Sequence, residues 1–93
     1  MDLKLKTLLA IEETGSFTKA AEILSLTQPA VSQQVKSLEQ DFNIIIFDKR
    51  KKKLELTQEG ELLLRYAKRV DLLTNNLITT FSSMKKNIPI KNT

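Results

Sequence analysis

The stretch 16–42, SFTKAAEILSLTQPAVSQQVKSLEQDF, decides the fold because it contains two helical patterns joined by a short turn. Residues 19–24 predict a first helix of barely two turns, for which Thr18 is a suitable N-cap. A helix this short is not stable in isolation, so it must pack against a neighbour. The small pair Ala20-Ala21 allows a close approach, and residues 25–27 predict the turn.

The second pattern predicts a longer helix over residues 28–42. Thr27 is its N-cap, and Pro29 lies in the first turn, where the missing N–H costs no hydrogen bond. Apolar residues recur at spacings of four, three and four, which predicts one core-facing side: Val31, Val35, Leu38 and Phe42. Two helices joined in this way form a helix-turn-helix, which offers the start of its second helix to base edges in the major groove.

Further elements flank the two helices. Residues 3–14 predict a preceding helix that ends at Gly15, a residue that adopts the left-handed conformation freely. The β-branched run 44–47 and the alternating run 54–56 predict two short strands of a hairpin. The predicted fold class is therefore mainly α, with a winged helix-turn-helix of three helices and a two-stranded wing in residues 1–57.

The positive charge is concentrated between the two predicted strands. The net charge of the chain is +4, and the run Lys49, Arg50, Lys51, Lys52 and Lys53 alone contributes +5. Such a loop on a nearly neutral body indicates a polyanion contact at one place. A solvated lysine-rich loop, a nuclear import signal and an anionic membrane patch have the same composition, so the run alone does not choose between them.

A long helix is predicted after the hairpin. Residues 61–86 contain neither Pro nor Gly, and Thr57 and the acidic residues after it suit a helix start, so residues 58–86 form a linker helix. Its apolar side follows a heptad pattern that Thr74 interrupts: Leu63, Ala67, Val70, Leu77, Phe81 and Met84. Such a helix is too long for a small body to cover, so its apolar side needs another surface, and the polar Thr74 leaves the choice of partner open. Residues 87–93, with Pro89, predict a flexible tail.

The composition excludes several function classes. The chain of 93 residues has no Cys and no His, which excludes disulfides, zinc sites and hydrolytic triads. Neighbouring acids at helix ends are more often solvated than catalytic, so we expect no enzyme, no catalytic or metal-binding residue and no cofactor. No apolar run approaches the ~20 residues of a membrane span, and no signal peptide is recognisable, so a cytoplasmic protein without a membrane partner is expected.

Several polar residues of the second helix suit DNA. Glutamine bonds adenine bidentately, serine is tolerant, and lysine bonds guanine or a phosphate. The candidates lie away from the apolar stripe or on its flank: Ser32, Gln33, Gln34 and Lys36. Taken singly, each is more often a solvated residue than a DNA contact. Their coincidence with the turn, the basic hairpin and a dimer-like helix favours DNA binding.

The ordered motifs of the chain resemble the DNA-binding half of LysR-type transcriptional regulators. The resemblance extends from about Leu3 to Val70 and includes residues 15–21 (GSFTKAA), Leu24, residues 27–32 (TQPAVS), Leu38-Glu39, Phe47 and residues 56–60 (LTQEG). It implies a winged helix-turn-helix and a linker helix through which two subunits pair on double-stranded DNA with an interrupted dyad. The effector-binding domain of the family is absent from these residues, and with it any small-molecule effector site.

The resemblance also implies residue roles. Ser16 and Thr18 are similar to residues that meet the DNA backbone, Thr27 to a capping residue that approaches a phosphate, and Arg50 to the wing arginine that probes the minor groove. The residues that resemble recognition-helix contacts are Gln28, Pro29, Ser32, Gln33 and Lys36.

The chain departs from the family pattern at three places. Asn43 stands where Gly is usual, and Gln33 stands where many members have Arg, which puts a guanine preference in doubt. The wing is mostly lysine, which discriminates bases less well than arginine and adds affinity more than specificity.

The sequence therefore predicts a sequence-specific DNA-binding dimer that regulates transcription in bacteria. An alternative is a short partner module that pairs with a longer relative through residues 61–86 and modulates it. A third hypothesis is a basic protein that binds any polyanion through residues 49–53. The operator, the effector and the sign of regulation do not follow from the residues.

Overall fold

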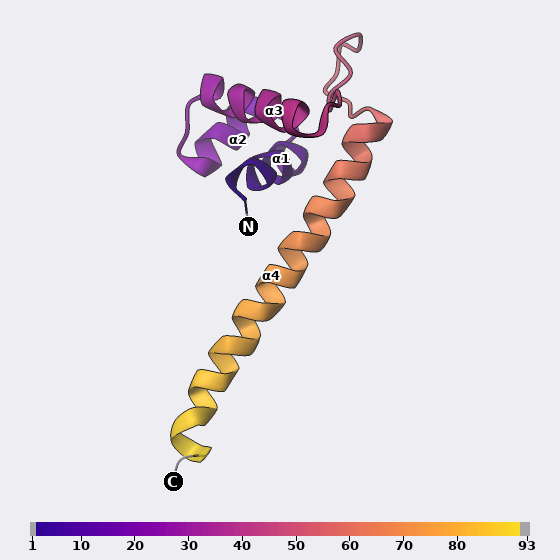
Figure 1. Ribbon diagram of the computed structural model, residues 1–93. Helices are drawn as coiled ribbons and strands as arrows, with labels where there is room; N and C mark the ends of the chain where they lie inside the picture. Colours follow the sequence, from indigo (N-terminus) through magenta and orange to yellow (C-terminus); the bar gives the residue numbers. More distant parts are fainter. Residues whose placement is uncertain (1, 92–93) are drawn as a thin grey trace.

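The computed structural model describes the backbone of residues 2–91 and the side chains of residues 2–86. The helices in this part of the chain are α1 (Leu3–Thr14), α2 (Phe17–Leu24), α3 (Gln28–Phe42) and α4 (Gln58–Lys91). α1, α2 and α3 pack into a bundle, whereas α4 starts beside the hairpin and extends far past the bundle (Figure 1). The mainly helical winged fold is thus confirmed. Over residues 2–91, no helix combines the length and the apolarity needed to cross a bilayer.

The predicted ends of α1 and α3 are confirmed by their caps. Gly15 ends α1 with φ +70°, and Asn43 ends α3 with φ +54°, so both adopt the left-handed conformation. Thr27 caps α3, since its Oγ1 accepts a hydrogen bond from the N–H of Ala30 at 3.2 Å. These caps depend on residues close in sequence, which is why the sequence predicts them.

The N-cap of α2 differs from the prediction. The sequence predicts Thr18, but the Oγ of Ser16 accepts a hydrogen bond from the N–H of Lys19 at 3.1 Å and so caps the helix. Thr18 lies exposed in the first turn. The helix starts earlier because Phe17 packs edge-to-face on Phe47, with ring centroids 5.4 Å apart. This contact depends on the tertiary fold and leaves no local sequence signal.

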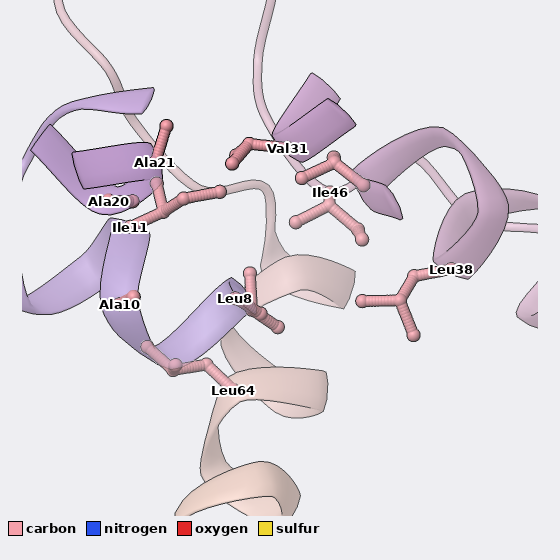
Figure 2. Close-up of a cluster of buried hydrophobic side chains, with 10 residues drawn as sticks. Leu8, Ala10, Ile11, Ala20, Ala21, Val31, Leu38, Ile46 and Leu64 are labelled. Carbon is pink, nitrogen blue, oxygen red and sulfur yellow. The ribbon is translucent and has the colours of Figure 1, made fainter. Parts of the chain in front are cut away.

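The core lies where α1, α2 and α3 meet the hairpin and the first turns of α4. Leu8 and Ile11 of α1 are fully buried, and the small Ala20 and Ala21 let α2 approach α1 closely. Figure 2 shows these side chains converging: Leu8, Ala10, Ile11, Ala20, Ala21, Val31, Leu38, Ile46 and Leu64. Phe42 departs from the predicted core stripe of α3, since it is 55% exposed at the end of the helix.

The hairpin is a smaller sheet than the sequence predicts. Its backbone pairing is one antiparallel bridge, between Phe47 and Leu56. The N–H of Asp48 donates to the carbonyl oxygen of Glu55 at 2.8 Å, and the N–H of Thr57 donates to that of Ile46 at 2.9 Å. The loop between these residues lacks the Gly, Asn or Pro that tight hairpin turns use, so pairing does not extend into it.

The first turn of α4 is held against the hairpin. The Oγ1 of Thr57 accepts the N–H of Gly60 at 2.9 Å and also bonds the carbonyl oxygen of Ile45. Gly60 is buried against Ile46, and a Cβ at this position would overlap the carbonyl oxygen of Ile46 and lie 3.0 Å from its carbonyl carbon. Only glycine fits here, which fixes where α4 starts.

α4 then packs on α1 and continues beyond it. Leu64 and Ala67 are buried, and the Nζ of Lys68 lies 2.9 Å from Oε1 of Glu12. The helix has 34 residues, about 51 Å at 1.5 Å per residue, and it includes residues 87–91, which the sequence assigns to a flexible tail. Once a helix is nucleated, each added residue contributes a hydrogen bond. Pro89 lies near the end of α4, where it lacks a donor and crowds the carbonyl of the preceding turn. Residues 92–93 of the predicted tail lie outside the described residues.

We expect Gly60→Ala to lower the free energy of unfolding by about 1–3 kcal/mol, although alanine is the better helix former, because the added methyl overlaps rigid backbone. Denaturant unfolding followed by circular dichroism measures this change. Gly15→Ala is the matched control: nothing lies within 4 Å of its Cβ, and the cost there is only the left-handed backbone, about 1–2 kcal/mol. An unaltered midpoint for Gly60→Ala would show that α4 does not dock in this way.

Candidate nucleic-acid interface

α3 has one buried side and one polar side. Val31, Val35 and Leu38 are buried against the bundle. The predicted contact residues lie elsewhere on the helix, and Ser32 is the half-buried member of a set that is otherwise exposed: Gln28, Pro29, Ser32, Gln33 and Lys36. The capped N-terminal turn of α3 therefore presents amide and hydroxyl groups to solvent, as base recognition in a major groove requires.

Two of these candidates contact each other. The Nε2 of Gln28 donates a hydrogen bond to the Oγ of Ser32 at 3.1 Å, across one turn of α3. The hydroxyl proton of Ser32 and the Oε1 of Gln28 remain available. The pair can thus offer one donor and one acceptor side by side, the pattern that the major-groove edge of adenine complements.

The amide of Gln34 is engaged within the fold. It turns inward, and its Oε1 lies 2.6 Å from the hydroxyl oxygen of Thr7, which is fully buried and also bonds the carbonyl oxygen of Leu3 at 3.0 Å. The amide of Gln34 thereby connects α3 to α1. The sequence places Gln34 on the flank of the apolar stripe, but it does not identify the buried threonine as its partner.

The residues expected near the DNA backbone lie at helix starts. Ser16 and Thr27 cap α2 and α3, so each hydroxyl oxygen is occupied as an acceptor while its proton stays available. Thr18 is exposed in the first turn of α2. Helix N-termini attract anions, because their N–H groups and the helix dipole favour negative charge. The arrangement is compatible with phosphate contacts at both helices.

The hairpin projects its basic loop away from the helices (Figure 1). Residues 49–53 are all exposed. Arg50 differs from the lysines because its Nε and Nη2 each donate to a carboxylate oxygen of Asp48 at 3.0 Å. These side-chain hydrogen bonds, followed by the one from the N–H of Arg50, lower the pKa of Asp48 to about 2, and the same pair raises the pKa of Arg50. The sequence analysis did not single out Asp48.

The bundle covers only part of the apolar side that the sequence predicts for α4, and the rest is exposed. Ala67 is 1% exposed and Leu63 half-buried, so both face the bundle of their own chain, whereas Val70, Leu77, Phe81 and Met84 are exposed. The apolar stripe that remains open, called the α4 stripe below, also includes residues that the heptad pattern omits. It consists of Leu62, Tyr66, Val70, Leu73, Leu77, Phe81 and Met84, all 38–67% exposed.

An apolar groove runs beside the first half of the α4 stripe. It has a volume of about 530 Å³, and Leu5, Phe42 and Ile44 form the wall on the side of the bundle. The opposite wall belongs to α4 and consists of one acidic residue, Glu59, and five less polar ones: Leu62, Leu63, Tyr66, Ala67 and Val70. The exposure of Phe42 therefore places an aromatic ring next to the stripe.

A capped helix with a polar outer side, followed by a basic hairpin, defines a winged helix-turn-helix of the DNA-binding class. Residues 3–61 match the family model of bacterial regulatory helix-turn-helix proteins of the lysR family. The chain belongs to this family of transcriptional regulators and is not an enzyme.

Known proteins of the family agree with this assignment. The chain is 45% identical over 82 residues to a protein of Guillardia theta named "Probable RuBisCO transcriptional regulator", covering 88% of this chain and 26% of that protein. The crystal structure of the BenM DNA-binding domain with benA site 1 DNA has a TM-score of 0.72 and 35% identity, covering 95% of this chain and 96% of that one. The CbnR DNA-binding domain in complex with DNA has a TM-score of 0.78 and 27% identity, over 90% and 98% of the two chains.

The chain spans about a quarter or less of the length of the curated RuBisCO-regulator relatives, such as 19% of the one from Synechocystis. Full-length LysG of Corynebacterium glutamicum has a TM-score of 0.79 and 34% identity over 88% of this chain, but over only 28% of its own length. The shared part is thus the helix-turn-helix, the hairpin and the long helix.

Proposed function

We propose that this chain binds double-stranded DNA sequence-specifically as a homodimer and so regulates transcription in the bacterial cytoplasm. α3 enters the major groove, where its exposed polar side meets base edges through Gln28, Pro29, Ser32, Gln33 and Lys36. The observation that best supports this is the polar, capped start of α3, with Gln28 and Ser32 already joined at 3.1 Å. Two structural neighbours, described as DNA complexes, support it further.

Backbone contacts complete the proposed interface. Ser16, Thr18 and Thr27 approach phosphates from the starts of α2 and α3. The exposed lysines of the hairpin, Lys49 and Lys51–Lys53, approach the backbone or the minor groove. Lysine is a compact point charge, so these contacts add affinity that falls with salt and contribute little discrimination among bases.

The α4 stripe supports an antiparallel homodimer because its members are symmetric about Leu73 to within one residue. In an antiparallel pair centred there, Leu62 lies opposite Met84 of the partner subunit, Tyr66 opposite Phe81 of the partner subunit, and Val70 opposite Leu77 of the partner subunit. The spacings along the stripe are four, four, three, four, four and three. This is an eleven-residue repeat, which favours a right-handed supercoil instead of a left-handed one.

Charge complementarity favours the same orientation. The only charged residues of α4 between Glu61 and Lys86 are Arg65, Lys68, Arg69, Asp71 and Lys85, so residues 72–84 carry no charge. The antiparallel register brings Glu61 beside the partner's Lys85 and the partner's Lys86, whereas a parallel pair would place like charges together. The dimer would also lay the second half of each α4 along the apolar groove of the other subunit, which is lined by Phe42 and Ile44.

A second candidate function uses the same stripe. The chain could pair with a longer relative and alter its DNA binding, since nothing in the stripe distinguishes a second copy from a relative with similar residues. A chain that stayed monomeric at high concentration and captured no longer relative would end this alternative. A stable homodimer that binds DNA by itself favours the main proposal.

Replacing Gln28 and Ser32 together by Ala should relax base preference, because each good base contact is worth about 1–3 kcal/mol, or roughly 5–150-fold in affinity. Competition between a selected duplex and a scrambled duplex measures the preference. The contrasting control is Lys51–Lys53→Ala, which should weaken binding to both duplexes alike and flatten its dependence on salt. Full preference in the α3 variant would contradict the proposed base contacts.

Leu73→Glu should raise the dissociation constant of the dimer by at least about 100-fold, since the interface would bury two unpaired carboxylates near the two-fold axis. Its control is Leu72→Glu, a neighbour of similar exposure that lies about 100° around the helix axis from Leu73 and outside the α4 stripe, so this variant should remain a dimer. Sedimentation equilibrium distinguishes the two.

The orientation can be tested by cross-linking because the chain has no cysteine. Leu62→Cys and Met84→Cys, introduced in the same chain, should give oxidised dimers in an antiparallel pair. Leu62→Cys alone should not. Rapid cross-linking of the single variant would indicate a parallel pair and contradict the proposed register.

A further inference from the structure

Arg50 is bound differently from the rest of the basic loop. Its guanidinium uses two nitrogens, Nε and Nη2, on the two carboxylate oxygens of Asp48, each at 3.0 Å. The backbone N–H of Arg50 adds a third hydrogen bond to Oδ1, also at 3.0 Å. Among the described side chains, no ion pair is recorded for the four lysines of residues 49–53. One cation of five therefore already has a fixed anionic partner.

Asp48 is firmly placed by the backbone. It follows the Phe47–Leu56 bridge, its N–H donates to the carbonyl oxygen of Glu55 at 2.8 Å, and its own carbonyl accepts the N–H of Lys51 at 3.3 Å. Its side chain is 15% exposed, whereas the side chain of Arg50 is 87% exposed. The exposed partner of the pair is thus the arginine, whose guanidinium folds back onto the less exposed carboxylate.

The Asp48–Arg50 pair also stabilises the turn, a role that Gly, Asn or Pro usually has. The loop contains none of the residues that usually stabilise a tight turn, and the carboxylate of Asp48 binds the N–H two residues further along, as in an Asx-turn. The forked guanidinium geometry that binds a carboxylate bidentately is the geometry that would bind a DNA phosphate. Asp48 and a phosphate therefore compete for the same atoms of Arg50.

We propose that Asp48 retains Arg50 as an internal clasp of the hairpin, so that Arg50 neutralises no DNA phosphate and the lysines alone make the electrostatic contact. This inference rests on the proposed DNA binding and revises the role that family resemblance implies for Arg50. Asp48 becomes a positioning residue that sets how many charges the hairpin contributes. Removing its charge releases one additional cation per subunit to the DNA.

The salt dependence of binding counts phosphate contacts, since the slope of log K against log salt changes by about 0.9 for each phosphate neutralised. The experiment measures this slope on one random-sequence duplex for the parent and for three variants: Arg50→Gln, Asp48→Asn and Lys51–Lys53→Gln. Asn at position 48 can still accept the N–H of Arg50, so it preserves the turn and removes only the charge. Thermal unfolding verifies that each variant is folded.

The proposal predicts an unchanged slope for Arg50→Gln and a slope steeper by about 0.9 per subunit for Asp48→Asn. The lysine variant should be less steep than the parent. A slope reduced by about 0.9 per subunit in Arg50→Gln would overturn the clasp, and so would an unchanged slope in Asp48→Asn. If the parent itself showed no salt-dependent binding, the proposed DNA binding would fail, which is a distinct result.

A spectroscopic measurement gives an independent test that does not depend on folding of a variant. The Nε–H resonance of Arg50 should keep its position when the duplex is added to the parent protein, because its acceptor remains the carboxylate of Asp48. A large shift of this resonance at saturating DNA would show that the guanidinium has moved to a phosphate, and the clasp would be wrong.

Discussion

The first turn of α4 lies directly against the backbone of Ile46, and both proposed functional surfaces depend on this contact. Gly60 has no room for a Cβ there, and Thr57 ties the same turn to the hairpin by hydrogen bonds. The contact fixes the direction in which α4 leaves the bundle. It therefore determines where the α4 stripe lies relative to α3, and in a dimer it would set the distance between two recognition helices.

The positive charge of the molecule is concentrated in a single segment. Outside residues 49–53 the chain is nearly neutral, and the excess positive charge lies in this one exposed loop. Within this loop the arginine is paired with Asp48 while the lysines point into solvent. Long-range attraction to a polyanion would come from the lysines, whereas discrimination among sequences would come from the uncharged amides and hydroxyls of α3.

Local sequence signals account for much of the fold. Gly15, Asn43 and Thr27 mark helix ends because caps depend on the nearest residues, and the bounds of α1 and α3 follow from them. The polar side of α3 is also predictable from its period. The cap at Ser16, the short pairing of the hairpin and the inward turn of Gln34 depend on contacts between elements, which no local pattern contains.

The division of the apolar side of α4 has the same origin. A heptad pattern treats Ala67 and Leu77 as equivalent, but the bundle covers only the first, because α1 lies against that part of the helix. The open stripe can be identified only after the docking of α4 is known. The pairing of Asp48 with Arg50 could not be predicted from the sequence, because a single acid beside a basic run has no distinctive spacing.

The most direct test of the central claim, a two-fold dimer that recognises bases, is selection of bound sequences from random duplex DNA with competitor at ~0.15 M salt. The account predicts enrichment of an interrupted dyad, with two half-sites related by the symmetry of the α4 pair. Binding that falls with salt but enriches no sequence would contradict it, since the lysine loop alone would then account for the interaction.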